Sequence, residues 1–110
     1  MRQHYLNTLE LMIVFALIHL GENAYGVSIA HEIEQRTGRD VLLGSIYAAL
    51  ERLEKKGLVS SRLGEATPQR GGRAKMYFRV TAKGLREVRQ TQRALQSLWK
   101  QIPQLRGNTI

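Results

Sequence analysis

A helical pattern followed directly by two strand-like runs is the feature that most restricts the fold of this sequence. Between Leu43 and Gly57 apolar residues recur at helical spacing, and Gly57 with two preceding lysines is typical of a helix end. Residues 58–63 and Met76–Val80 then have the composition and alternation of strands. The segment between them holds Pro68, a Gly-Gly pair and several basic residues, which predicts a flexible, positively charged turn. This order of elements predicts a winged helix-turn-helix.

Two further helices are predicted before this unit. Residues 5–20 are apolar on nearly all sides, so this helix must be buried on more than one side. A chain of 110 residues has little material for such burial, which suggests a dimer, although a core helix with some exposed leucines explains the pattern equally well. Residues 25–37 form the second helix, and residues 38–43 the turn before the third. The second helix and the third helix, joined by this turn, have the helix-turn-helix pattern.

The charge of the chain points to a polyanionic partner. A formal net charge of +8 and a pI near 10.5 favour nucleic acid over an anionic membrane surface, the alternative being a basic protein with neither partner. The absence of cysteine excludes disulfides and thiolate metal sites and agrees with a reducing compartment. The longest apolar run, residues 11–20, is well short of the about 20 residues that span a bilayer. We therefore expect a cytoplasmic protein.

Candidates for catalytic chemistry are few. His4, His19 and His31 are the only histidines, and no two of them have the spacing of metal ligands. Ser45 has no evident base beside it in the sequence, which argues against a nucleophile. The sequence therefore predicts that the protein is not an enzyme, and it gives no reason to expect a metal or another cofactor.

The third helix and the basic loop hold the candidate contacts to nucleic acid. The helix face opposite the apolar stripe begins with small residues, which would let it lie close to another polymer. We expect this face to enter the major groove of double-stranded DNA, and the loop to contact phosphates or the minor groove. A winged helix used as a protein–protein adaptor would need an apolar, uncharged face here, and binding of structured RNA is a further alternative. The predicted DNA-binding residues are Ser45, Tyr47, Ala48 and Arg52 on the helix and Arg70, Arg73 and Lys75 in the loop.

A last helix is predicted to begin after Thr81, a good N-cap, and to end at Pro103. Its apolar residues repeat in steps of three and four, as in a coiled-coil seam. We expect it to pair with the same helix of a second copy in a homodimer; a helix folded back on its own domain is the alternative. Residues 1–80 would then be the DNA-binding domain and residues 81–110 the dimerisation helix and tail. The predicted interface residues are Leu85, Val88, Gln92, Leu95, Trp99 and Ile102.

Trp99, the only tryptophan, has two interpretations. It can simply fill space in a core or an interface. In a symmetric dimer it would instead face its own copy near the two-fold axis, where two indoles could hold a flat aromatic ligand between them. The sequence alone leaves both interpretations open.

Several motifs occur together along nearly the whole chain. They are Tyr25-Gly26, residues 44–47, residues 50–59, residues 70–73, residues 75–78 and residues 81–84. With them the sequence resembles the PadR family of bacterial transcriptional regulators, of the short type with a single C-terminal helix. The resemblance implies a homodimer that binds a palindromic operator and represses transcription, and that in some members is released by a small aromatic ligand. Ala48 departs from the pattern, because the family usually has proline there.

Overall fold

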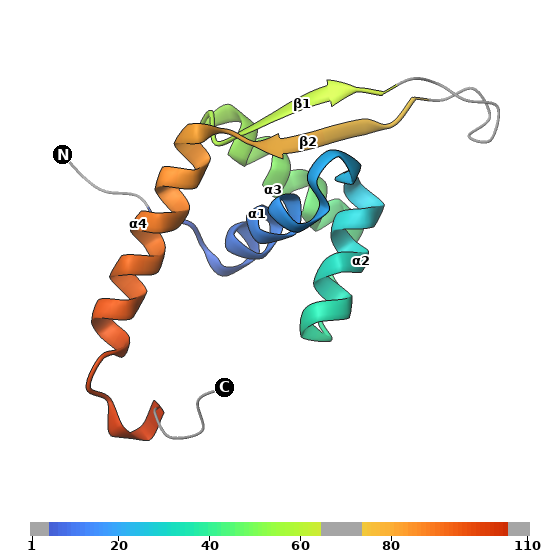
Figure 1. Ribbon diagram of the computed structural model, residues 1–110. Coiled ribbons are helices and arrows are strands. Elements are labelled where there is room, and N and C mark those ends of the chain that lie inside the picture. The colour runs from blue at the N-terminus through green and yellow to red at the C-terminus, as the bar shows by residue number, and fades with distance from the viewer. Residues whose placement is uncertain (1–4, 65–73, 106–110) are drawn as a thin grey trace.

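The computed structural model describes residues 5–64 and 74–105 (Figure 1). Most of these residues are helical, and one antiparallel hairpin supplies their only sheet. This confirms the predicted fold class, a mainly α winged helix-turn-helix. The elements are α1 (Thr8–Leu20), the 3₁₀ turn η1 (Gly21–Asn23), α2 (Gly26–Thr37), α3 (Leu43–Lys55), β1 (Val59–Leu63), β2 (Met76–Val80), α4 (Ala82–Trp99) and the 3₁₀ turn η3 (Pro103–Leu105).

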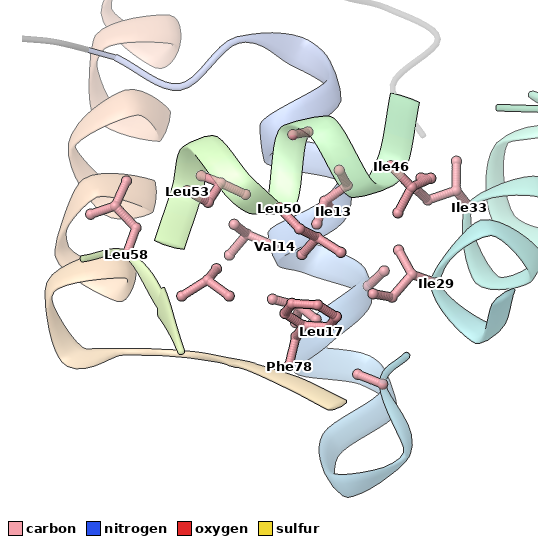
Figure 2. Packing of buried hydrophobic residues seen from close by; sticks show 14 of the residues in the cluster. Ile13, Val14, Leu17, Ile29, Ile33, Ile46, Leu50, Leu53, Leu58 and Phe78 are labelled. Carbon is pink, nitrogen blue, oxygen red and sulfur yellow. The ribbon is translucent and has the colours of Figure 1, made fainter. Parts of the chain in front are cut away.

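One hydrophobic core forms where α1, α2 and α3 meet the hairpin (Figure 2). α1 supplies Ile13 and Val14, which have no exposed surface, and Phe78 of β2 packs against the same cluster. Burial of this apolar area is the main term that stabilises the fold. The core also fixes α3 so that its opposite face is exposed. The buried stripe of α3 is the one that its spacing predicted: Ile46, Ala49, Leu50 and Leu53.

The hairpin pairs β1 with β2 in a register that runs from Val59 opposite Val80 to Leu63 opposite Met76. β1 begins one residue later than predicted. A single bridge between Tyr25 and Tyr77 lies beside this two-stranded sheet, where the Phe78 N–H donates to the carbonyl of Ala24 at 2.9 Å. The link between α1 and α2 is thereby attached to the edge of the hairpin.

The start of α1 and the end of α4 differ from the prediction. α1 begins at Thr8 rather than at residue 5, because the side chain of Asn7 caps the helix. α4 ends at Trp99 rather than just before Pro103, because Lys100 leaves the helical conformation with a ψ of 140° and Gln101 follows with a φ of 61°, which a right-handed α-helix does not accommodate. Ile102, predicted as part of the helical seam, therefore lies beyond the helix.

α4 leaves the core about halfway along its length (Figure 1). From its start to just past its midpoint, Gly84, Val88 and Thr91 are buried. In its second half Leu95 and Trp99 are 51% and 59% exposed. The first half of α4 is thus packed with the winged helix, while the second half projects from it. Among the described residues, none of the helices is both long and apolar enough to cross a membrane.

Candidate nucleic-acid interface

The outward face of α3 begins with side chains of minimal size. Gly44, Ser45 and Ala48 are all exposed, and a Cβ built on Gly44 would meet no atom within 4 Å. Their neighbours on the inward face are held in the core, so the backbone beneath the small residues is fixed. A second polymer could therefore approach the first turns of α3 closely, as the sequence predicted.

Tyr47 belongs to the same turns, but its side chain packs against the start of α2. A Cβ built on Gly26 would lie 2.3 Å from the Tyr47 hydroxyl oxygen, so only glycine fits beneath this ring as it stands. Gly26 is buried at the first position of α2. The Tyr25-Gly26 motif therefore lets the starts of α2 and α3 lie against each other. Tyr47 remains partly exposed beside Ser45 and Ala48.

Arg52 lies one to two turns further along α3 and is paired with a residue that the sequence analysis did not single out. Its Nε is 3.6 Å from Oε2 of Glu10, and Nζ of Lys56 is 3.6 Å from the same oxygen. The Glu10 side chain is only 3% exposed, whereas that of Arg52 is 49% exposed. The spacing of Asn7 and Glu10 matches a capping box, which could have revealed the cap of α1 but not the contacts with α3.

Two aromatic rings in contact with each other each carry a cation at the base of the wing, which is the hairpin with its connecting loop. Nζ of Lys75 is 3.8 Å from the centroid of the Tyr25 ring, and Tyr25 meets Tyr77 edge to face at 5.7 Å. The Arg62 guanidinium is 4.8 Å from the centroid of the Tyr77 ring and donates to Glu22 at 3.2 Å. Such contacts restrict where the two cations can lie.

The wing loop itself is only partly within the described residues. Arg70 and Arg73, two of the predicted contacts, fall outside them. The Gly64 N–H donates to the carbonyl of Lys75 at 2.7 Å, so the strands continue toward the loop as far as Lys75. Within residues 5–64 and 74–105, there is no group of three or more His, Asp or Glu residues that could hold a metal ion.

A groove of about 460 Å³ lies between α1 and the projecting half of α4. Three of the predicted interface residues, Gln92, Leu95 and Trp99, line it. Val88 is instead buried in the chain's own core, and the exposed Leu98 was not predicted. We call this the α1–α4 groove; its lining residues are Leu11, Phe15, Gln92, Leu95, Gln96, Trp99 and Lys100.

An exposed small-residue face on the third helix, next to a hairpin whose base is rich in cations, defines a winged-helix DNA-binding protein. Comparison with known sequences agrees: the Transcriptional regulator PadR-like family matches residues 14–90. The chain belongs to this family, whose members are transcription factors rather than enzymes.

One curated relative, an uncharacterized protein of Lysinibacillus sphaericus, is 35% identical over 74 residues. That match covers 66% of this chain and 64% of the relative, so the chain spans less than two thirds of the relative's length.

Solved structures of similar chains have the same fold. A transcriptional regulator from Clostridium thermocellum is 27% identical with a TM-score of 0.73, and the match covers 90% of each chain. A PadR family regulator from Clostridium difficile is 25% identical with a TM-score of 0.72, covering 92% of this chain and all of that one. F93 from STIV, a winged-helix DNA-binding protein, has a TM-score of 0.66 at 19% identity, covers 89% of this chain and 98% of that one, and supports the fold alone.

Proposed function

We propose that this protein is a cytoplasmic, sequence-specific repressor that binds a palindromic operator as a homodimer. The observation that carries the proposal is the outward face of α3, which is small, exposed and backed by the core. In winged helices the residues at the start of such a helix contact base edges in the major groove. Ser45, Tyr47 and Ala48 would then lie nearest the bases, and Arg52 would contact a base or an adjacent phosphate.

Two exposed leucines at the start of α3 add an apolar contact that the sequence analysis missed. Leu42, the N-cap residue, is 76% exposed, and Leu43 follows it at the first helical position. Apolar side chains in the major groove read the methyl group of thymine. Leu42 and Leu43 would therefore favour thymine at the edge of each half-site. A helical periodicity could not reveal Leu42, because the N-cap residue lies before the period begins.

The wing would supply contacts that are independent of sequence. Lys75, held over the Tyr25 ring, and Arg70 and Arg73 of the loop would contact phosphates or the minor groove. Each such contact releases counterions and makes binding salt-dependent.

The homodimer is proposed from the apolar surface that this chain leaves uncovered. Leu95, Leu98 and Trp99 on α4 and Phe15 and Ile18 on α1 are all exposed, and the α1–α4 groove lies beside them. Exposed apolar surface of this kind marks an interaction site. The commonest way for a protein to cover it is a two-fold symmetric dimer, in which the same patch of each copy meets the other. The pairing would place the two α3 helices about 34 Å apart, one turn of DNA.

A planar aromatic effector is the further element of the proposal. Trp99 lines the α1–α4 groove, so two copies facing each other across a dimer axis could hold a flat ligand. The alternative is that Trp99 only packs in the interface. Titration of its fluorescence with a panel of planar aromatics separates the two: a saturable quench or shift supports the effector, and an unchanged spectrum across the panel supports packing alone.

A gel shift tests the central proposal. The probe is the DNA upstream of the protein's own gene, with a shuffled duplex and a structured RNA of equal length as competitors. We expect a shift that the unlabelled probe abolishes at far lower concentration than either competitor does. Equal competition by all three would contradict sequence-specific binding, and no shift at low salt would favour the protein–protein adaptor.

A further inference from the structure

The N-terminal turn, which we define as residues 6–10, lies between α3 and α4 and contacts both through buried polar groups. On the α4 side, the backbone N–H of Leu6 donates to Oγ1 of Thr91 at 3.1 Å. Both residues are buried. A buried backbone N–H without an acceptor is costly, so the start of the turn is tied to the middle of α4.

Within the turn, Asn7 and Glu10 cap α1 reciprocally. The Glu10 N–H donates to Oδ1 of Asn7 at 2.8 Å, and the Asn7 N–H donates to Oε1 of Glu10 at 3.0 Å. This pair of bonds closes the turn into a compact unit. A displacement of Leu6 therefore displaces the Glu10 carboxylate as well.

On the α3 side, the other carboxylate oxygen of Glu10 faces Arg52 and Lys56, each at 3.6 Å. Because Glu10 is almost completely buried, these two cations compensate its carboxylate in place of water. The end of α3 cannot move away from α1 without leaving a buried carboxylate poorly compensated.

A second connection joins the same end of α3 to the start of α4. Oγ1 of Thr81 lies 2.7 Å from the Gly57 carbonyl, to which it donates, and Nζ of Lys83 donates to the Lys56 carbonyl at 3.0 Å. With a rise of about 1.5 Å per residue, Thr91 lies about 15 Å along the helix axis from Thr81. One point of attachment would let α4 swing, whereas two points this far apart fix its angle.

We infer that Glu10 is a positioning residue for DNA recognition, which together with Thr91 fixes the angle between α4 and α3. This rests on the proposed function: in a dimer joined through α4, that angle sets the separation of the two α3 helices. A ligand in the α1–α4 groove, whose wall includes Leu11 next to Glu10, would act on the same connection.

Hydrogen exchange tests the connection without DNA. Thr91→Val removes the acceptor for Leu6, and Glu10→Gln keeps the capping oxygen while removing the charge that faces α3. We expect each variant to speed exchange of the Lys56 and Gly57 amides about fivefold, the effect of about one hydrogen bond. Thr91→Ser, which retains the hydroxyl, and the exposed-site control Glu34→Gln should match the wild type. Faster exchange confined to the Leu6 amide in Thr91→Val would overturn the inference.

Operator spacing tests the consequence for recognition. The two half-sites, obtained by selection from random DNA, are moved apart or together by one and two base pairs. We expect wild-type affinity to fall at least tenfold for a change of two base pairs, and the Thr91→Val and Glu10→Gln variants to lose less than threefold. A uniform loss at every spacing would reduce both residues to a merely structural role. If the wild type binds no DNA, the proposed function fails, and the exchange measurement alone decides whether the connection exists.

Discussion

Gly84 of α4 lies directly on the carbonyl oxygen of Leu58: a Cβ at residue 84 would be 2.2 Å from that oxygen. The backbones of the two segments therefore touch. The Thr81 N–H also donates to the Leu58 carbonyl, at 3.0 Å. This contact joins α4 to the chain between α3 and β1, and it explains the glycine in the motif of residues 81–84.

Gly84→Ala should destabilise the protein by about 1–3 kcal/mol, because the added methyl group meets rigid backbone rather than a movable side chain. Urea unfolding at one protein concentration measures the effect. Gly44→Ala is the matched control. Its methyl group enters open space, so we expect an unfolding free energy that is unchanged or raised by up to about 1 kcal/mol. Equal losses in the two variants would contradict the contact with Leu58.

Arg52→Ala should lower the ratio of operator to random-DNA affinity by about 1–3 kcal/mol, if the half of its side chain that is exposed contacts a base. Fluorescence anisotropy with the two duplexes measures the ratio. Lys56→Ala is the control, because it also removes one cation from Glu10 but lies beyond the last helical residue of α3. An equal loss on both duplexes in Arg52→Ala would make the arginine a phosphate contact.

Lys75→Ala should weaken binding to every duplex to a similar extent, and Arg73→Ala should do the same. Each substitution removes one phosphate contact, so the slope of log Kd against log salt should become shallower by about one. Lys100→Ala, beyond the end of α4, should leave the slope at its wild-type value. A wild-type slope in both wing variants would place the wing outside the interface.

Leu42→Ala should reduce sequence preference without loss of stability, since the side chain is largely exposed. Replacing thymine by deoxyuridine at the edge of each half-site removes only the methyl group. We expect this replacement to weaken wild-type binding and to have no effect on Leu42→Ala, because the contact is then already absent. Parallel losses in wild type and variant would show that Leu42 does not touch the methyl group.

Sequence periodicity predicted the parts of this fold that depend on local repetition. The buried stripe of α3 from Ile46 to Leu53 and the strand Met76–Val80 agree with the structure because burial on one face imposes the spacing. Contacts between distant positions have no such signature. Lys75 over Tyr25 joins residues from the wing and the start of α2, and nothing in either local pattern marks them as partners.

The predicted apolar seam of α4 is a second case in which the sequence could not show which residues contact one another. A heptad repeat marks one apolar face, but it does not say what covers each residue. Val88 is covered by the chain's own core, whereas Leu95 further along the same face is exposed. The point where a helix leaves its domain depends on the positions of other elements, here α1 and the hairpin, and not on the helix's own sequence.

Leu95→Glu should convert the proposed dimer into monomers of 12.5 kDa. The substitution places a carboxylate from each copy in an apolar interface, where desolvation without a partner is costly, so we expect the dimer Kd to rise about 100-fold or more. Sedimentation velocity over a range of concentrations measures this. Ser97→Glu makes the same change of charge two residues away, at an exposed position on the opposite side of α4, and should leave the dimer intact.

Because Leu95 is half exposed in the single chain, its replacement should cost little folding stability, and far-ultraviolet circular dichroism should match the wild type. A wild-type protein that sediments as a monomer at micromolar concentration would remove the dimer from the proposal.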